Sequence, residues 1–417
     1  MPSRFEKQKL PSAVYWLALL AFGLRVAARL HSGIADFWVN GYRFFFAMAQ
    51  NIAEGKGIGI EGAATAFRVP LYPIFLAGLT LGHKAFWPIA IAQSAIGAGT
   101  VFCAALLARQ IYGGPRAATA ATLAAAMAAV YPYYVIHDTA LEETSLFTLL
   151  TLAAVLLLRR TAETSRMATG ALAGVLLGLD VLTRATIAPF ALLAPLWLFW
   201  QRRMHAGLAC AFLLVLTVAP WLIRNDIVMG VPTLSTETGI ELWNGNNGYL
   251  FQHYPAESSD LSKAEALHAL SAEEQRELDR IEDNEELTNR WFLGKAFAYM
   301  RAHPGQTAVD GLRKIAAAFD WLPSPRRGRM ANLAYALSYG PVMLLGVWGM
   351  WRRRGCWRQD AAIYLLFAAF IAVTAVFWAH TSHRAYLDVY WMVFAAGGLA
   401  EAWAALAQRG RGPELKS

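Results

Sequence analysis

The sequence has little charge for its length. Only 16% of its 417 residues are Asp, Glu, Lys or Arg, whereas roughly 25% is usual for soluble domains. Hydrophobic residues make up 57%, and the mean hydropathy is +0.35. Apolar runs long enough to cross a bilayer recur through the chain. A soluble globular fold is therefore excluded, and the composition predicts a polytopic membrane protein.

Cysteine and the common catalytic motifs are also scarce. The three cysteines form no disulfide framework and no C-x-x-C metal spacing. The sequence contains no GxxxxGK[ST], no HExxH and no GxSxG. A glycine-rich stretch at 55–59 follows no predicted strand, which argues against a nucleotide-binding loop. No internal repeat or low-complexity tract is visible.

Positive charge falls in short clusters between the apolar runs. The net charge of +8 and the pI near 9.4 are therefore interpreted as topology signals and not as a nucleic-acid surface. The clusters occupy residues 4–9, 109–116, 159–166, 202–203, 352–358 and 409–416. By the positive-inside rule they are cytoplasmic. This predicts a plasma (inner) membrane protein with both termini inside and its active site on the external, periplasmic face.

The alternation of apolar runs and charge predicts an all-α fold of about ten transmembrane helices. Arg25 and Arg29 interrupt the end of the first run and no A-x-A site follows, which favours an uncleaved first span. The spans are expected near 12–30, 86–108, 117–136, 143–158, 168–183, 186–200, 206–223, 331–350, 361–379 and 386–407.

Three parts of the chain follow from this topology. Residues 1–223 form an N-terminal transmembrane module, 224–330 an external insertion, and 331–417 a C-terminal transmembrane module. The first external loop, 31–85, is too polar to span yet rich in aromatics, so amphipathic surface helices are expected there. The insertion is rich in acidic residues between 257 and 290, where a solvated helical face is the simplest interpretation.

Acidic residues near the external face are few, which makes them candidates for catalysis. Glu143 lies at the mouth of an apolar run, where a carboxylate is costly without a partner or a task. Asp36 stands early in the first loop. For Asp138 an N-cap of the following helix is the structural alternative, and for Asp180 it is an i,i+4 pair with Arg184.

Basic, amide and aromatic groups form a second set on the same face. One arginine alone is usually a lipid anchor, but several from separate spans suit a phosphate-bearing ligand. In the segment WNGNNG (243–248), amide and aromatic groups suit a sugar, with a plain turn as the alternative. Pro70 and Pro73 are expected to prevent a regular helix around Arg68. The candidate binding residues are Arg68, Tyr72, Arg184, Arg224, Asn225, Trp243, Asn246, His380, His383 and Arg384.

Several segments in succession resemble the family 39 type of GT-C glycosyltransferases, which includes protein O-mannosyltransferases and the lipid A aminoarabinose transferase. The matching segments are MAQNIAEGKGI (48–58), AFRVPLYPIFLAG (66–78), YPYYVIHDTALEETSLF (131–147), LDVLTRAT (179–186), PWLIRND (220–226), LWNGNN (242–247) and HTSHRAYL (380–387). The resemblance implies a membrane enzyme that moves a sugar from a polyprenyl-phosphate donor to a lipid, glycan or protein acceptor.

The resemblance also implies an acidic base in the first external loop, sometimes assisted by a divalent metal. The family position falls on Gly41, so Asp36 or Glu143 is expected to be the base, and Asp36, Asp138 and Glu143 are the candidate metal ligands. The expected reaction inverts the sugar, and the expected partners are the lipid-linked donor, the acceptor and membrane lipids. A flippase of a lipid-linked glycan and an inactive donor-binding relative are the alternatives.

Overall fold

The computed structural model describes residues 9–34, 37–38 and 43–410. Its core is a bundle of apolar helices whose positions follow the ten predicted spans. The bundle helices are α1 (Ser12–Ser32), α5 (Phe86–Tyr112), α6 (Ala117–Val130), α7 (Pro132–His137), α8 (Thr144–Thr164), α9 (Met167–Val181), α10 (Ala188–Trp200), α11 (Met204–Met229), α17 (Arg329–Arg352), α18 (Trp357–Val376) and α19 (Thr381–Gly410). Short 3₁₀ turns join several of them: η1 (Gly114–Arg116), η2 (Ala185–Ile187) and η4 (Arg354–Cys356).

Seven helices in the described part of the chain are long and apolar enough to cross a membrane. These are α1, α5, α8, α11, α17, α18 and α19, and they support a multi-pass membrane protein. The other predicted spans are shorter: α6, α9 and α10 have 14, 15 and 13 residues, where a full span needs about 20. The predicted third span, 117–136, is interrupted at Pro132, where α7 begins. Proline starts a new helix there because it has no N–H to donate.

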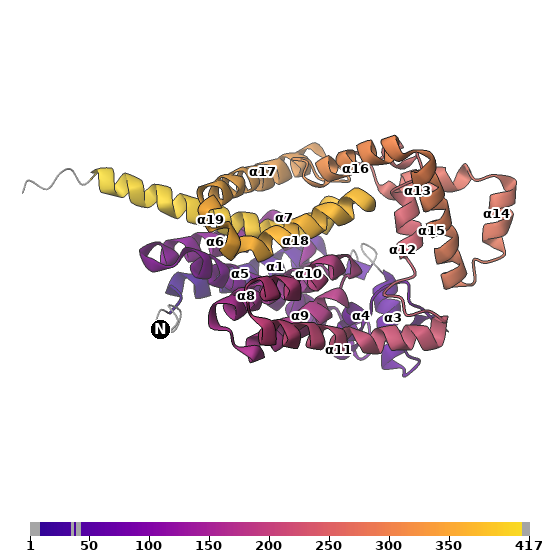
Figure 1. Ribbon diagram of the computed structural model, residues 1–417, viewed down its shortest axis with the longest axis horizontal. Helices are drawn as coiled ribbons and strands as arrows, with labels where there is room; N and C mark the ends of the chain where they lie inside the picture. The colour runs from indigo at the N-terminus through magenta and orange to yellow at the C-terminus, as the bar shows by residue number, and fades with distance from the viewer. Residues whose placement is uncertain (1–8, 35–36, 39–42, 411–417) are drawn as a thin grey trace, which may run out of the picture.

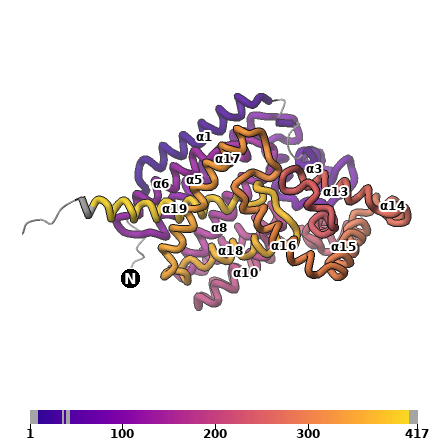
Figure 2. Tube along the Cα trace, turned by 90° about the horizontal axis from the view of Figure 1, so that it is seen from above, coloured from indigo at the N-terminus to yellow at the C-terminus, as the bar shows by residue number. Residues whose placement is uncertain are grey.

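The bundle helices lie along the long axis of the molecule, and the two long non-spanning segments meet at one end of it (Figure 1). The helices of the insertion and α3 of the first loop occupy that end, whereas α19 extends beyond the bundle at the other. The view from above shows the same separation (Figure 2). We call the end that carries α3 and the insertion the loop end.

The first loop folds against the bundle instead of forming a solvated linker. It contains α3 (Arg43–Ala53), a hairpin of β1 (Gly59–Ile60) and β2 (Ala63–Ala64), and α4 (Leu71–Thr80). The strands are antiparallel, with Gly59 opposite Ala64. The expectation that Pro70 and Pro73 prevent a regular helix is wrong, because α4 begins directly after Pro70. Proline is tolerated in a first helical turn, where backbone N–H groups have no intrahelical acceptor.

The insertion is helical and has a small apolar core of its own. It consists of α12 (Thr238–Asn244), η3 (Leu250–Gln252), α13 (Ser259–His268), α14 (Ala272–Asp279), α15 (Glu285–Ala302) and α16 (Pro304–Ala318). Trp243 and Phe292 pack together in this core with ring centroids 5.1 Å apart. The acidic helix α14 buries no residue, in agreement with a solvated face. The predicted boundaries of the insertion are 224 and 330. In the structure α11 ends at Met229 and α17 begins at Arg329.

A buried ion pair joins α1 to the turn between α7 and α8. The Arg25 Nε lies 2.5 Å from the Asp138 Oδ2, and the Arg25 side chain is fully buried. Arg25 also donates to the carbonyl oxygens of Ala21 and Ala129. Asp138 is therefore a buried partner of Arg25, and the alternative of an N-cap is wrong, because Glu143 occupies the N-cap position of α8.

A glycine in α5 makes room for this ion pair. A Cβ added at Gly97 would stand 2.2 Å from the Arg25 Nε and 2.4 Å from the Asp138 Oδ2. Two residues further along α5, a Cβ at Gly99 would meet only Leu149, at 3.4 Å, which is ordinary contact. The pair and Gly97 thus form one packing unit across three segments.

We expect Gly97→Ala to destabilise the protein by about 1–3 kcal/mol, the usual cost of overpacking. The matched variant Gly99→Ala should be neutral or slightly stabilising, because alanine favours helix more than glycine does. Thermal unfolding of both variants in the same detergent measures the difference. Equal unfolding temperatures for the two variants would contradict the packing described here.

Candidate functional site

Glu143 and Arg184 form the central ion pair of the loop end. The Arg184 Nη2 and Nε lie 2.8 and 3.1 Å from the Glu143 Oε1, and Nη2 also donates to the Thr144 hydroxyl. The guanidinium stands over the Phe147 ring, 4.8 Å from its centroid. The expected Asp180–Arg184 pair is absent from the described ion pairs, and Asp180 instead accepts a hydrogen bond from the Thr151 hydroxyl at 2.7 Å.

The second oxygen of Glu143 is placed differently from the first. Oε2 is buried and has no hydrogen-bond partner among the described residues. A buried carboxylate oxygen left without a donor is costly in a folded protein. Such an atom at the start of a membrane helix is a candidate to accept a proton from a ligand.

A second acid–base pair stands beside the first. The Glu142 Oε1 contacts the His137 Nδ1 across the turn between α7 and α8. Burial raises the pKa of Glu142, but the His137 and Arg184 charges outweigh it and hold this pKa below its usual value. His137 was not among the residues selected from the sequence.

The first loop and the insertion contribute a third pair. The Arg68 Nη2 lies 2.6 Å from the Glu237 Oε1, and the Arg68 side chain remains 32% exposed, against 12% for Arg184. Burial raises the pKa of Glu237 to about 8, although the neighbouring Arg68 charge lowers it. Glu143 is among the charges that act on Glu237, so the two carboxyl groups lie within electrostatic range of each other.

Backbone contacts hold Arg68 and Glu237 together. The Ser235 hydroxyl donates to the Phe67 carbonyl at 2.6 Å, and the Thr236 amide donates to the Ala66 carbonyl at 3.0 Å. The extended strip before α4 is thereby fixed against the strip before α12. Arg68 and Glu237 both lie where these two strips of the loop and the insertion meet.

These three pairs make up what we call the charged cluster, together with His383 of α19. His383 lies within electrostatic range of Arg68, His137 and Arg184, and its ring is 5.3 Å from that of Trp378. The cluster therefore draws on the first loop, the turn before α8, the turn after α9, the insertion and α19. Its members are Arg68, His137, Glu142, Glu143, Arg184, Glu237 and His383.

A cavity of about 280 Å³ opens beside Arg68. Phe44 and Phe67, which line it, also flank the Arg68 guanidinium with centroids 5.4 and 5.8 Å away. The cavity is lined by Phe44, Ile60, Ala63, Ala64, Thr65, Phe67 and Glu285. It therefore lies between the first loop and α15, with a partly exposed arginine at its side.

The other candidate residues lie in contacts that hold the insertion and loop to the bundle. Arg224 donates to the carbonyl oxygens of Ile58 and Thr65. Asn225 donates to the Thr233 carbonyl, and Asn246 accepts from the Lys314 ammonium. Trp243 is buried in the core of the insertion.

Tyr72, His380 and Arg384 are likewise engaged in packing. The Tyr72 hydroxyl donates to Gln93 at 3.2 Å. His380 contacts the Ser259 and Ser324 hydroxyls, and burial lowers its pKa to about 4. Arg384 is fully buried in an ion pair with Asp388, 3.0 Å away. We do not place these residues in the charged cluster.

The predicted metal set is not assembled by the residues that the structure describes. No group of three His, Cys, Asp or Glu side chains within them could hold a metal ion. Asp138 is bound by Arg25 and Glu143 by Arg184. Asp36 and Gly41 lie outside the described residues, so the role of Asp36 stays a prediction.

Besides His137, sequence reasoning missed Glu237. It lies in the segment LSTETG, six residues before Trp243, within an insertion whose acidic residues were interpreted as a solvated face. The available signal was position, because this carboxylate precedes an apolar helix instead of lying in the exposed acidic run. Its partner Arg68 is distant in sequence, so the pairing could not be inferred.

Comparison with known proteins supports the family resemblance that the sequence indicated. Residues 68–223 match a family model described as dolichyl-phosphate-mannose-protein mannosyltransferase, which covers rather more than a third of the chain. The matched region includes Arg68, Glu143 and Arg184. No curated protein matches the chain.

Solved structures show the fold. The oligosaccharyltransferase of Archaeoglobus fulgidus in its apo form is similar with a TM-score of 0.54 and 15% identity, covering 96% of this chain and 51% of the archaeal chain. ArnT from Cupriavidus metallidurans bound to undecaprenyl phosphate aligns over 95% of this chain and 80% of its own, with 13% identity and a TM-score of 0.40, too low to carry an argument. The chain has a GT-C-like membrane fold and spans about half the length of the archaeal enzyme. The predicted resemblance is thus confirmed.

The raised pKa of Glu237 predicts a pH dependence of stability. Its usual pKa is 4.5, whereas in the folded protein it is about 8. The folded state therefore retains a proton that the unfolded chain has lost, and this contribution to the free energy of unfolding decreases as pH rises from about 4.5 to about 8. We expect the unfolding temperature of Glu237→Gln to fall less over this interval than that of the wild type.

An exposed carboxylate in the same insertion serves as the control. Glu265→Gln removes the same charge from the surface of α13 and should retain the pH slope of the wild type. A Glu237→Gln variant with an unchanged slope would show that Glu237 is ionised throughout this interval.

Proposed function

We propose that this protein is a membrane glycosyltransferase that takes a sugar from a polyprenyl-phosphate donor at the external face. The observation that carries the proposal is the charged cluster, in which carboxylates and arginines from distant segments meet, with Arg68 at the side of a cavity. The family model that matches residues 68–223 is named for a dolichyl-phosphate-linked sugar, which supports a donor of this chemical class. The acceptor is a hydroxyl or amine on a lipid, glycan or protein.

The proposed reaction is a single displacement at the sugar C1. The acceptor oxygen or nitrogen forms a bond to C1 while the bond between C1 and the phosphate oxygen breaks. The departing polyprenyl phosphate keeps the bonding electron pair, and the acceptor proton passes to a carboxylate. Attack opposite the leaving group inverts the configuration at C1.

Glu143 is the proposed base. Arg184 holds its Oε1, which orients the carboxylate. Oε2 remains available to accept the acceptor proton. Asp36, which lies outside the described residues, is the alternative base.

Arg68 is the proposed ligand of the donor phosphate. It is the more exposed arginine of the cluster and stands at the side of the cavity. An arginine there stabilises the negative charge that develops on the leaving phosphate. Glu237, with its pKa near 8, is largely neutral near pH 7 and so competes weakly with the phosphate for Arg68.

The arrangement in the membrane follows from this assignment. The loop end faces the external side, the basic clusters at the opposite end face the cytoplasm, and both termini lie inside. The first loop and the insertion form the two walls between which the acceptor enters, and the donor chain remains in the bilayer beside the bundle.

We expect Glu143→Gln to lower kcat by about 10²- to 10⁴-fold, the usual contribution of a general base. Glutamine keeps the size of the side chain and an acceptor for Arg184 but cannot take the proton. Purified protein in detergent, given a radiolabelled polyprenyl-phosphate sugar and an acceptor extract, measures the rate.

Glu163→Gln provides a control on the same helix, since Glu163 is an exposed carboxylate at the opposite end of α8, and it should keep wild-type activity. Full activity in Glu143→Gln would exclude this residue as the base and favour Asp36. Movement of the donor across vesicles without sugar transfer would instead support a flippase, and donor binding without either would support an inactive relative.

A further inference from the structure

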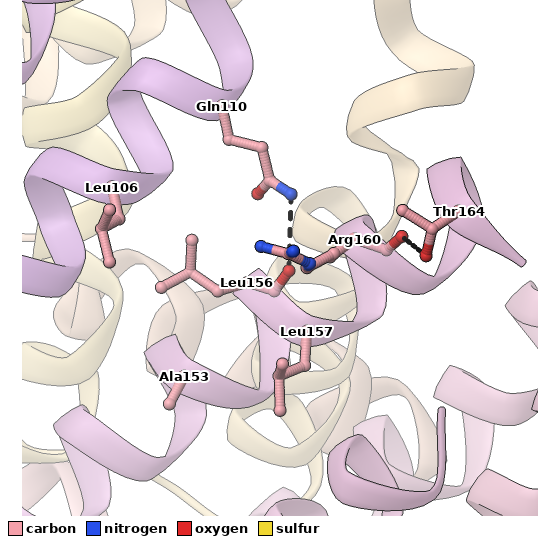
Figure 3. Close-up of a pocket in the computed structure, with 7 residues that line it drawn as sticks. All are labelled: Leu106, Gln110, Ala153, Leu156, Leu157, Arg160 and Thr164. Atoms are coloured by element: carbon pink, nitrogen blue, oxygen red, sulfur yellow. Dashed lines mark hydrogen bonds between the residues drawn. The ribbon is translucent and has the colours of Figure 1, made fainter. Parts of the chain in front are cut away.

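A groove lies between α5 and α8 at the end of the bundle opposite the charged cluster. Its volume is about 350 Å³, and seven residues line it (Figure 3): Leu106, Gln110, Ala153, Leu156, Leu157, Arg160 and Thr164. Arg160 is 17 positions after Glu143 on α8, so the groove mouth is about 25 Å along the helix from the proposed base. The groove therefore does not belong to the site already described.

Apolar side chains line most of the groove, and polar side chains line one end of it. Ala153 and the three leucines line the apolar part, which extends from Arg160 to Ala153 over about 10 Å of helix. Arg160 is exposed, and in Figure 3 its guanidinium reaches toward Gln110 across the groove. This order of groups matches a lipid with one chain along the leucines and its head at the arginine.

Gln110 adds a hydrogen-bond acceptor near the polar end. Its Nε2 donates to the Leu156 carbonyl at 3.5 Å, while its Oε1 is buried and has no partner among the described residues. A buried amide oxygen without a donor is costly. A headgroup with hydroxyl groups would supply that donor.

The basic residues around the groove indicate that its ligand is anionic. The connections at this end are basic, including Arg109, Arg116 and Arg166. The nearby acid Glu163 lies within electrostatic range of Arg160, but no acidic residue lines the groove. A groove of this kind favours an anionic headgroup over a zwitterionic one. Its volume fits part of one acyl chain and not a protein helix, which is about 10 Å across.

We propose that the groove between α5 and α8 binds an anionic phospholipid of the leaflet opposite the charged cluster. Its phosphate meets Arg160, a glycerol hydroxyl of the headgroup donates to the Gln110 Oε1, and one acyl chain lies along the leucines. The bound lipid packs between two helices that both begin at the loop end, so it stabilises the bundle from its far side.

The test uses the full chain in detergent micelles, titrated with phosphatidylglycerol or phosphatidylcholine. Native mass spectrometry counts bound lipid, and thermal unfolding measures the stabilisation. We expect phosphatidylglycerol to bind the wild type and raise its unfolding temperature more than phosphatidylcholine does. In Arg160→Gln the phosphatidylglycerol affinity should fall about fivefold, the usual contribution of one basic residue at a membrane surface.

Two further variants distinguish binding in the groove from general attraction of the lipid to positive charge. Arg116→Gln removes an equal charge from an exposed position outside the groove and should bind phosphatidylglycerol as the wild type does. Ala153→Phe keeps all charges but fills the groove, and it should also lose the bound lipid. Its unfolding temperature without lipid shows whether it is folded.

Three results would overturn the proposal. One is equal phosphatidylglycerol binding by Arg160→Gln and the wild type. Another is equal binding of the two lipids by the wild type. The third is a cross-link between two copies of the chain at residue 153, which would assign the groove to a protein interface.

Discussion

The cost of a charge inside an apolar bundle governs this structure. An arginine or carboxylate removed from water needs a partner of opposite charge and further hydrogen bonds. Arg384 with Asp388 meets this requirement in full, because the remaining polar atoms bind carbonyl and tyrosine groups. Arg25 with Asp138 meets it in part, because Arg25 also binds two carbonyl oxygens but its Nη2 has no hydrogen-bond partner among the described residues. Arg25 and Asp138 join α1 to the turn between α7 and α8. Arg384 and Asp388 lie one turn apart on α19, and their hydrogen bonds to Tyr131, Ala318 and Tyr335 join that helix to distant segments. Pairing of charge therefore also sets how the helices pack.

The charged cluster obeys the same requirement less completely. Arg184 is partnered by Glu143, yet one oxygen of that carboxylate has no hydrogen bond within the described residues. Arg68 is partnered by Glu237 and still remains partly exposed. A pair that is fully buried and has all its polar atoms bonded serves packing, whereas a partly exposed pair at the side of a cavity is suited to a ligand. This contrast separates Arg384 from Arg68, although both were candidates for the same role.

The two long loops depend on each other for their shape. Glu285 at the start of α15 accepts from the Ala66 amide and the Thr236 hydroxyl, and so binds the first loop and the strip before α12 at once. Arg224 reaches from α11 to the carbonyls around the hairpin. The aromatic first loop is therefore a wall shared with the insertion, and its position depends on residues 159 to 219 positions away.

The positions of the bundle helices could be predicted because each depends on a local apolar run of sufficient length. The helix after Pro70 was missed because a proline within a run was weighed as a breaker, although its place in the first turn permits a helix. Asp138 and Asp180 were given local partners, an N-cap and the i,i+4 arginine. Their actual partners, Arg25 and Thr151, lie 113 and 29 residues away, at distances that local patterns do not reach.

Sequence alone determined the membrane class, the sites of the helices and the residue types available at one face, since these depend on hydrophobicity and charge along short segments. It also made Glu143 a candidate, because a carboxylate at the mouth of an apolar run is costly without a partner or a task. Only the tertiary structure decided which arginine pairs with which acid, and it alone brought Glu237 beside Arg68. The physical reason is that electrostatic pairing and burial act through space between segments whose separation in the chain carries no record of their contact.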